Sequence, residues 1–504
     1  MSEPSFTLTE ITIYNLSVRI RTKDYLIYNE LKKFLNKYYT VYQNSFNTSD
    51  KEVKPYYFFS HEEFFIHINQ FKHFLYYLKQ IGVGNIVANR IDKRDYQEHI
   101  MNYTVRPKWT LRESQIKVQE FLTTNPQGSK LVPLPTGSGK TVVALISAAK
   151  VNKKISLIII PQFIEKWVSD IVNIHEANTK DIMVVQGSKA LQTLIKLAKE
   201  NQLDSKYFIF SLRTLQEFIS SYEKDPQATV EYFDIEPIEL FPLLGIGTVI
   251  VDETHMQFHA LFRVMLFVNV KYHIGLSATL IAENKTLDRV HKIMYTESNI
   301  YKDIQLSKYT DVYAVAYSLA PEHIKRIRTK NYGSNNYSHI AFENSVIKYP
   351  DILKRYIDII DKLLNYYYLE DKKPDDKLLI FVSTVKLATI LTEYFASKYK
   401  HLKVSRYCEQ DSYDNIITSD ITVTTIISAG TGLDIPNLRV CIQTVSISST
   451  VANIQTFGRL RKLQDRDTKF VYIYCEQIPK QKEYHFKRKE IFFPRAANII
   501  EKRL

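Results

Sequence analysis

The segment LPTGSGKT, Leu134 to Thr141, has the residues of a loop that binds phosphate. Its glycines let backbone N–H groups approach an anion at the start of the predicted helix VVALISAAK, and an apolar segment precedes it. We expect Lys140 to reach the β- and γ-phosphates of a nucleotide and the Thr141 hydroxyl to ligate magnesium. The usual pattern is G-x-x-x-x-G-K-S/T; Leu134 stands at its first position, so only the GKT core is strict.

Two adjacent carboxylates end the segment VIVDETH, Val249 to His255. Such a pair after a strand is usually a solvated turn, but the phosphate loop upstream favours a catalytic pair at the carboxyl end of the strand. We expect Asp252 to hold magnesium and Glu253, beside the metal, to orient and deprotonate the attacking water. His255 is expected to relay the state of the nucleotide to neighbouring segments.

Guanidinium groups gather in QTFGRLRK, Gln455 to Lys462, far from the loop in sequence. Phosphoryl transfer needs added positive charge as the γ-phosphate loosens, and arginine supplies it with fork geometry. The alternative is a basic helix start on a solvated face. We favour Arg459 as an arginine finger, and either Arg461 or Lys462 as the second cation.

The segments that position these residues alternate apolar runs with helical patterns. Between about 110 and 300 the runs are SLIIIP, KYFIFS, GTVIVDE and YHIGLSAT, and the second series is VYAVAYS, KLLIFVST, ITVTTI, RVCIQTV and KFVYIYCE. This rhythm predicts an α/β fold with two parallel sheets and crossover helices. A polar stretch around 300–345 is predicted to be a hinge or loop.

The two ends of the chain carry no catalytic motif. Residues 1–100 mix short alternating runs with an aromatic-rich helical pattern, HEEFFIHINQFKHFLYYLKQIG, and predict a small α+β accessory domain. Aromatic residues at helical spacing more often form core than wedges. The tail KQKEYHFKRKEIFFPRAANIIEKRL is predicted to be a basic helix.

The composition is that of a soluble globular protein. Hydrophobic residues make up 45% and charged residues 24% of the 504 residues, which excludes a disordered chain, a collagen-like fibre and a coiled coil. No run reaches the about 18 apolar residues of a membrane span, and the N-terminus does not resemble a secretory signal. Cys408, Cys441 and Cys475 are too far apart for a zinc knuckle or a disulfide framework, so we expect a cytoplasmic protein.

The net charge favours a polyanionic partner. Lys and Arg exceed Asp and Glu by 67 − 54 = +13, and 35 Tyr and 27 Phe supply rings for stacking. Both features suit nucleic acid, although a coding bias toward Lys, Tyr and Asn would give the same composition.

The ordered segments resemble the ATPase core of superfamily 2 helicases, in which two RecA-like domains flank one ATP. LRESQ (Leu111 to Gln115) resembles the Q motif, LPTGSGKT motif I, LIIIPQFIEKW motif Ia, FSLRTLQ motif Ic, VDETH motif II, LSAT motif III, IFVST motif IV, SAGTGLDIP motif V and QTFGRLRK motif VI. The resemblance covers roughly residues 105–480. Within the superfamily the chain looks most like phage branch-migration helicases of the UvsW type.

The resemblance implies ATP and Mg2+ as cofactors and DNA as partner. It implies an N-terminal DNA- or branch-recognition domain (1–104), two RecA-like domains (105–300 and 301–480) and a basic helical tail (481–504). The implied activity is an ATP-dependent helicase or translocase that unwinds or branch-migrates forks, displacement loops and four-way junctions in phage replication, recombination and repair. The alternatives are an RNA-directed or transcript-release helicase, a catalytically silent clamp and a restriction-type motor subunit, although the sequence shows no nuclease constellation of carboxylates and Lys. Removal of residues 1–100 is expected to spare basal ATP hydrolysis.

The resemblance also implies roles for individual residues. Gln115 would contact adenine with Arg112 nearby, and Ser277 and Thr279 would couple hydrolysis to motion. The implied nucleotide-binding set is Arg112, Gln115, Pro135, Thr136, Gly137, Ser138, Gly139, Lys140, Thr141, Asp434 and Gln455. The implied nucleic-acid contacts are Pro161, Gln162, Trp167, Arg213 and Thr214 in the first domain and Thr384 and Thr424 in the second. Core packing is the alternative for Trp167, because large aromatic side chains are mostly buried.

Overall fold

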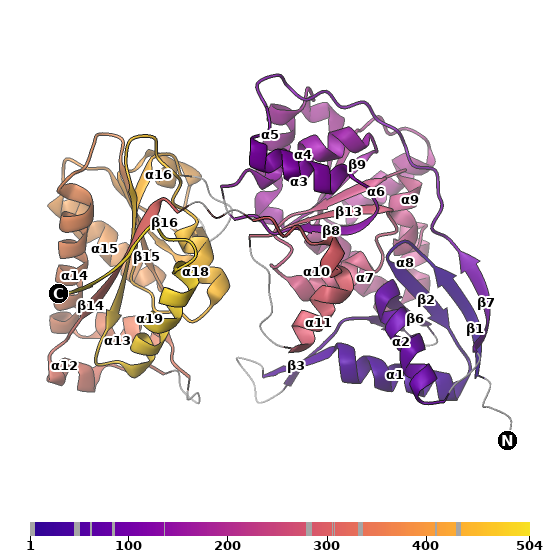
Figure 1. Cartoon of the computed structure of the whole chain (residues 1–504), viewed down its shortest axis with the longest axis horizontal. Helices are drawn as coiled ribbons and strands as arrows, with labels where there is room; N and C mark the ends of the chain where they lie inside the picture. Colours follow the sequence, from indigo (N-terminus) through magenta and orange to yellow (C-terminus); the bar gives the residue numbers. More distant parts are fainter. Residues whose placement is uncertain are drawn as a thin grey trace. The chain divides into compact units, whose positions relative to one another are not determined.

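The computed structural model of the chain divides into two compact units (Figure 1). Unit 1 contains Met1–Leu134 and Ser138–Ile304, and unit 2 contains Pro135–Gly137 and Gln305–Leu504. The structure describes residues 6–44, 51–60, 63–82, 86–135, 137–278, 285–304, 306, 308–330, 336–408, 411–429 and 435–504. Thr136, Thr279 and Asp434 lie outside the described residues.

A six-stranded sheet with the order β10-β11-β9-β12-β13-β8 forms the centre of unit 1. Every neighbouring pair in it is parallel. Its strands are β8 (Gly128–Val132), β9 (Ile155–Ile159), β10 (Ile182–Val185), β11 (Tyr207–Ser211), β12 (Thr248–Val251) and β13 (Tyr272–Leu276). Four of them confirm the strands predicted from SLIIIP, KYFIFS, GTVIVDE and YHIGLSAT, whose continuous apolar runs fit strands buried on both faces.

Helices cover both faces of this sheet (Figure 1). The helices of this part of unit 1 are α3 (Glu113–Thr123), α4 (Lys140–Val151), α5 (Ile164–Ile174), α6 (Ser188–Lys199), α7 (Leu212–Lys224), α8 (Pro226–Phe233), α9 (Leu240–Leu243), α10 (Phe258–Met265) and α11 (Lys285–Met294). Short 3-10 turns lie at η1 (Pro161–Phe163), η2 (Thr179–Asp181), η3 (Pro237–Glu239) and η4 (Glu297–Asn299). On α5 the buried apolar stripe is Ile164, Trp167, Ile171 and Ile174.

The N-terminal region has a mixed five-stranded sheet with the order β5-β6-β2-β1-β7. Its strands are β1 (Phe6–Ile13), β2 (Ser17–Arg21), β5 (Phe58–Ser60), β6 (Glu63–His67) and β7 (Ile86–Asp92), with helices α1 (Tyr25–Tyr39) and α2 (Ile68–Gln80) and a two-stranded ribbon of β3 (Thr40–Asn44) and β4 (Lys51–Pro55). The predicted helix over HEEFFIHINQFKHFLYYLKQIG is therefore wrong in its first part. Phe64, Phe65 and Ile66 pair with β2 as a buried strand, and the helix begins only after the capping residue His67.

The N-terminal sheet and the first parallel sheet share one hydrophobic core. The ring of Phe65 lies 4.6 Å from that of Phe267, and Phe58 lies 5.0 Å from Phe267 in an edge arrangement. A buried ion cluster joins the same regions, because Arg19 pairs with Glu63 at 2.6 Å and with Glu236 at 2.8 Å. Residues 1–104 thus have a sheet of their own and bury its apolar face against the remainder of unit 1.

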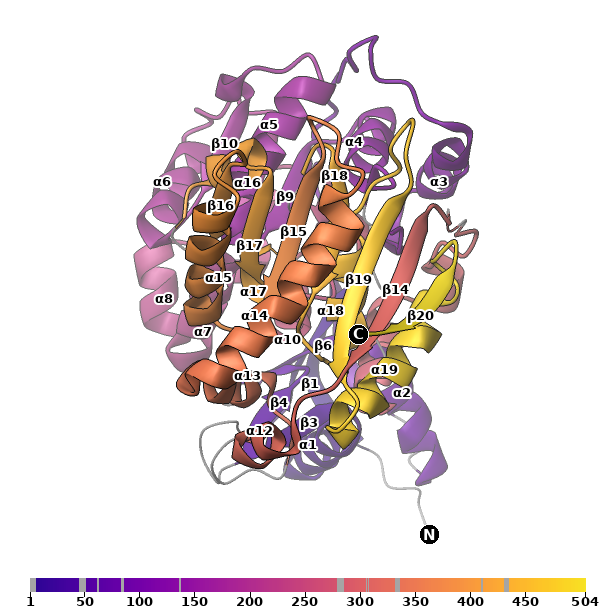
Figure 2. The same ribbon diagram turned by 90° about the vertical axis from the view of Figure 1, so that its left-hand side faces the viewer.

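Unit 2 contains a seven-stranded parallel sheet with the order β16-β17-β15-β18-β19-β14-β20, which Figure 2 shows with α14 and α15 across its near face. The strands are β14 (Thr310–Tyr317), β15 (Lys377–Val382), β16 (Val404–Tyr407), β17 (Ile421–Thr425), β18 (Leu438–Gln443), β19 (Thr468–Cys475) and β20 (Ile499–Arg503). The helices are α12 (Pro321–Arg326), α13 (His339–Lys348), α14 (Pro350–Leu364), the π-helix η5 (Asn365–Leu369), α15 (Val385–Lys398), α16 (Tyr413–Thr418), α17 (Ile426–Ala429), α18 (Thr450–Phe457) and α19 (Pro479–Phe492). The five strands predicted in this half are confirmed.

Two predictions in this half are corrected. The stretch 300–345 includes the boundary between the units but also β14 and α12, so it is not one loop. The tail is helical only through Phe492; β20 then pairs with β14 and completes that edge of the sheet. Within α19 the guanidinium of Arg488 is buried and donates to Oδ1 of Asn453 at 3.1 Å.

No helix among the described residues is long and apolar enough to cross a membrane.

Candidate nucleotide site and nucleic-acid groove

The phosphate loop connects the end of β8 to the start of α4. Gly137 and Gly139 both have φ of +80°, a left-handed conformation that side chains rarely adopt. At Gly139, the N-cap residue that precedes α4, a Cβ would lie 2.3 Å from Nε2 of Gln115. The loop therefore needs glycine, both for its left-handed backbone and for the close approach of Gln115. The N–H groups in the first turn of a helix such as α4 make no hydrogen bond within the helix and can bind an anion.

The LRESQ segment binds this loop through hydrogen bonds to its backbone. Oε1 of Gln115 accepts the backbone N–H of Arg112 at 2.9 Å, and Nε2 of Gln115 donates to the carbonyl oxygen of Ser138 at 2.9 Å. The guanidinium of Arg112 donates to the same carbonyl at 3.1 Å. Both residues expected near adenine thus bind the backbone of the phosphate loop in this structure.

Lys140 lies close enough to Asp252 and His255 to influence both side chains. Its Nζ donates to the carbonyl oxygen of Leu134 at 3.1 Å, and its charge acts on the pKa of both Asp252 and His255. The loop follows β8 and the carboxylates follow β12, with β13 between these parallel strands. Both segments therefore lie at the carboxyl edge of one sheet, where such folds place their sites.

Asp252 is held at both carboxylate oxygens. Oδ1 accepts the backbone N–H of Glu253 at 2.8 Å, and Oδ2 accepts the indole N–H of Trp167 at 2.9 Å. Burial raises the pKa of Asp252, and the neighbouring carboxylate of Glu253 raises it further, while Lys140 opposes both effects. A divalent cation would favour the ionised form of Asp252 in the same way as Lys140 does.

Glu253 and His255 form a short buried turn after Asp252. Glu253 has φ of +47°, an uncommon conformation for a residue with a side chain and one that recurs at functional sites. Nδ1 of His255 lies 3.0 Å from Oγ of Ser277 and 3.3 Å from Oε2 of Glu253. Burial and the charge of Lys140 lower the pKa of His255 to about 4, so its imidazole is neutral at neutral pH.

The residues present fit ATP with magnesium. Within the described part of the chain no group of three or more His, Cys, Asp or Glu side chains forms a metal site by itself. Mg2+ commonly uses one or two carboxylates together with substrate phosphates and water, so a site of few protein oxygens suits it. Thr141, at the start of α4, and Asp252, after β12, are the side chains that would hold it, and Glu253 follows Asp252 in the chain.

A groove of about 620 Å³ lies beside the start of α5 in unit 1. Three of the expected nucleic-acid contacts, Pro161, Gln162 and Arg213, line it. The side chain of Arg213 is 78% exposed and pairs with Glu217 at 2.9 Å. The remaining lining residues are Ile160, Gln216, Glu217, Ser220 and Gln257.

The other two expected contacts of unit 1 face inward. Trp167 is fully buried, as the core-packing alternative requires, and its N–H binds Asp252. The buried hydroxyl of Thr214 accepts the backbone N–H of Gly187 at 2.7 Å. Neither side chain presents a polar group to the groove.

The two expected contacts of unit 2 also use their hydroxyls internally. Thr384 donates to Oε2 of Glu343 at 2.9 Å and accepts from the N–H of Leu387 at the start of α15. Thr424 is buried and donates to the carbonyl oxygen of Tyr407 at 2.6 Å. Glu343, which no sequence motif indicates, also accepts the backbone N–H groups of Ser383 and Thr384 at 2.7 and 2.8 Å.

The arginine-rich segment follows α18 in unit 2. Arg459 is buried and its Nε donates to the carbonyl oxygen of Gln455 at 3.3 Å, while Arg461 donates to the carbonyl oxygen of Gly458. Lys462 is exposed. The hydroxyl of Tyr309 donates to the carbonyl oxygen of Leu460 at 3.1 Å and so fixes the backbone between the two arginines.

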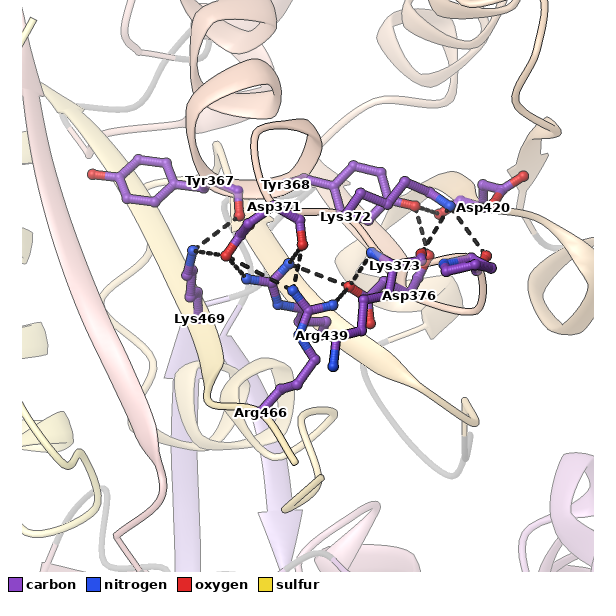
Figure 3. Close-up of polar contacts among 11 residues, drawn as sticks. Tyr367, Tyr368, Asp371, Lys372, Lys373, Asp376, Asp420, Arg439, Arg466 and Lys469 are labelled. Carbon is purple, nitrogen blue, oxygen red and sulfur yellow. Dashed lines mark hydrogen bonds and ion pairs between the residues drawn. The ribbon is translucent and has the colours of Figure 1, made fainter. Parts of the chain in front are cut away.

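An ion cluster anchors the far end of this segment (Figure 3). Arg466 and Arg439 both donate to the carboxylate of the buried Asp376, the latter at 3.2 Å. Asp371 pairs with both arginines and with Lys469 at 3.4 Å. The cluster ties the chain just before β15, β18 and β19 together, and the arginine-rich segment runs between it and α18.

Sequence comparison finds two similarities to known proteins. Residues 90–282 match the family model described as Type III restriction enzyme, res subunit. The chain is 22% identical over 414 residues to Putative helicase 22 of Sulfolobus islandicus filamentous virus (isolate Iceland/Hveragerdi), an alignment that covers 74% of this chain and 67% of the viral protein.

Solved structures show the same fold at low identity. S. cerevisiae Dbp5 bound to RNA and ADP BeF3 is 14% identical with a TM-score of 0.50, over 78% of this chain and 89% of that one. A Dbp5 variant from S. cerevisiae bound to a Gle1 variant and IP6 is 13% identical with a TM-score of 0.51, over 81% and 96% of the two chains. The two parallel-sheet domains thus resemble the RecA-like domains of these helicases in fold, and a mixed N-terminal region accompanies them.

Proposed function

We propose that this chain is an ATP-driven helicase or translocase that remodels branched DNA. The observation that carries the proposal is the site of unit 1, where the glycine loop, Lys140 and the Asp252–Glu253 pair lie at one edge of a parallel sheet. This arrangement provides an anion cradle, a cation for the phosphates, a metal-binding carboxylate and a base.

In the proposed reaction Lys140 neutralises charge on the β- and γ-phosphates, and Glu253 orients a water molecule and takes up its proton. Bound ATP with magnesium supplies the phosphoanhydride whose hydrolysis drives the motor. Neutral His255, hydrogen-bonded to Ser277, links the state of Glu253 to the segment that follows β13. Arg459 serves as the arginine finger from the second RecA-like domain, with Arg461 or Lys462 as the second cation.

The groove supports a phosphate-binding role for unit 1. Arg213 is mostly exposed, and Pro161 and Gln162 are exposed beside it at the start of η1. Contacts of this kind go to the backbone of nucleic acid, so binding would be independent of sequence and sensitive to salt.

Residues 1–104 are proposed to bind the branch point. On the β3–β4 ribbon Tyr42 and Val53 lie opposite each other and are 59% and 53% exposed. Tyr25 at the start of α1 is 74% exposed. Exposed rings on a region packed firmly against the motor suit stacking on unpaired bases.

The substrate is tested by ATP hydrolysis on matched single-stranded, duplex, forked and four-way-junction nucleic acids, in DNA and in RNA, with Lys140→Ala as the blank. The proposal expects the largest stimulation on branched DNA, with conversion of the junction into products, as for branch-migration helicases of the UvsW type. Largest stimulation by RNA would instead establish the alternative, an RNA-directed or transcript-release helicase. A role in phage replication, recombination and repair in the host cytoplasm is part of the proposal.

A further inference from the structure

Trp167 carries the one polar atom in an otherwise aliphatic buried stripe of α5. It belongs to the buried stripe of α5, between Ile164 and Ile171, and none of its surface is exposed. A buried indole N–H needs a hydrogen-bond partner, because an unsatisfied one costs about 1–3 kcal/mol. Its partner is Oδ2 of Asp252, at 2.9 Å.

This hydrogen bond restricts the Asp252 carboxylate. The N–H of Glu253 holds Oδ1 and the indole holds Oδ2, so the plane of the carboxylate is fixed from two sides. Side chains that hydrogen-bond to metal-binding carboxylates orient them, and their loss typically costs 10–100-fold in metal affinity or activity. The hydrogen bond of the Trp167 indole goes to Asp252, so we expect its effect on magnesium to act through that carboxylate.

The short turn η1, which immediately precedes α5, carries residues of the nucleic-acid groove. Pro161 and Gln162 form η1, which runs directly into α5, and Trp167 lies on the buried side of the helix that follows. A ligand that moves the start of α5 therefore moves the indole donor relative to Asp252. Packed helices shift as rigid bodies, so such a displacement reaches the donor.

We propose that Trp167 is a positioning residue that orients Asp252 for magnesium and couples occupancy of the groove to the ATP site. This inference rests on the proposed ATPase function and deepens it by naming the residue that connects its two ligand sites.

The chain contains a matched control. Trp109 is the other of its two tryptophans, and its Nε1 donates to the backbone carbonyl oxygen of Asn173 at 2.8 Å. Trp109→Phe removes an indole hydrogen bond that does not involve Asp252. It also leaves Trp167 as the sole tryptophan, whose fluorescence then reports on the Asp252 contact.

The first test measures the contact directly. In the Trp109→Phe protein, adding Asp252→Asn exchanges the charged acceptor of the Trp167 indole for a neutral one, and we expect the emission maximum of Trp167 to shift. Identical emission spectra with and without Asp252→Asn would overturn the proposal. This experiment leaves Trp167 in place and does not depend on a variant with a cavity at that position.

The second test measures the magnesium dependence of binding of a non-hydrolysable ATP analogue, with and without a single-stranded DNA oligonucleotide. We expect Trp167→Phe to raise the half-saturating Mg2+ concentration by about tenfold or more over that of Trp109→Phe. We also expect it to lose the shift that the oligonucleotide causes in Trp109→Phe. Equal magnesium dependence in the two variants would overturn the role of Trp167 alone, whereas failure of the wild-type protein to bind the analogue would overturn the proposed function with it.

Discussion

The side-chain amide of Gln115 donates a 2.9 Å hydrogen bond to the carbonyl oxygen of Ser138, in the centre of the phosphate loop. Its other end accepts the backbone N–H of Arg112 and caps α3. Resemblance to the Q motif assigns this glutamine to adenine, but both ends of its amide are engaged with backbone groups here. In this structure Gln115 therefore supports the phosphate loop through these two hydrogen bonds.

Gln115→Ala is therefore expected to weaken the binding of ATP and GTP by similar factors. Loss of the two hydrogen bonds loosens the loop that every nucleoside triphosphate would use, at about 1 kcal/mol for each bond. Equilibrium binding of the two nucleotides to the variant and to the wild-type protein measures this. A selective loss of ATP binding would show that Gln115 reads the base.

Arg213→Ala is expected to weaken binding of single-stranded DNA by about threefold to tenfold and to reduce the salt dependence by about one phosphate contact. The reason is that Arg213 is the cation lining the groove, with most of its side chain exposed. Lys196→Ala is the matched control, since Lys196 on α6 is also an exposed cation, 76% exposed, and does not line the groove. Fluorescence anisotropy over a salt series distinguishes the two variants. Equal losses of DNA affinity in both would show that the groove does not bind DNA.

Asp376→Ala is expected to destabilise unit 2 by about 3–5 kcal/mol, because the buried guanidinium of Arg439 and the half-buried one of Arg466 both lose that carboxylate. Asp371→Ala is the control in the same cluster. The Asp371 side chain is 49% exposed, against 7% for Asp376, so we expect its loss to cost less than about 1 kcal/mol. Urea unfolding followed by circular dichroism measures both variants. A larger effect at Asp371 would contradict the assignment of Asp376 as the central acceptor.

Glu343→Gln is expected to flatten the pH dependence of the stability of unit 2. Burial raises the pKa of Glu343 from 4.5 to about 7, so the folded state binds a proton that the unfolded state releases between these values. Stability from this group is complete below about pH 4.5 and is lost as the pH rises through 7, by up to about 3 kcal/mol. The neighbouring His339 has its pKa lowered to about 3 by burial and stays neutral in this range.

The measurement is the free energy of unfolding of the wild-type protein and Glu343→Gln between about pH 5 and pH 8. Glu393→Gln, a change at an exposed residue of α15, serves as the control and should follow the wild-type curve. Parallel curves for all three proteins would show that Glu343 is ionised throughout.

The strands and the phosphate loop were predictable because their information is local. A run such as SLIIIP has no polar position to place in water, and GSGKT carries its glycines, lysine and hydroxyl within a few residues. The pattern predicts helix over β6 because Phe64, Phe65 and Ile66 continue the aromatic pattern of α2, and only pairing with β2 makes them a strand. β20 depends in the same way on the free edge of β14.

The contacts that hold the site were not predictable from spacing. The bond between Trp167 and Asp252 and the bond between Glu343 and Thr384 each join residues from different elements, and neither has a local pattern. The expectation that residues 1–100 can be removed without loss of basal ATP hydrolysis likewise ignores contacts between distant segments. Their sheet packs on Phe267 and their Arg19 on Glu236, so removal exposes an apolar face and leaves Glu236 without its partner.

The central claim, that unit 1 binds and hydrolyses ATP, is tested most directly by comparing nucleotide binding with turnover in three proteins. The wild-type protein should bind and hydrolyse ATP; Glu253→Gln should bind it with little or no turnover, since the variant retains the cradle and loses the base. Lys140→Ala should lack hydrolysis, because the cation for the phosphates is gone. Turnover at the wild-type rate in either variant would contradict the assignment of this site.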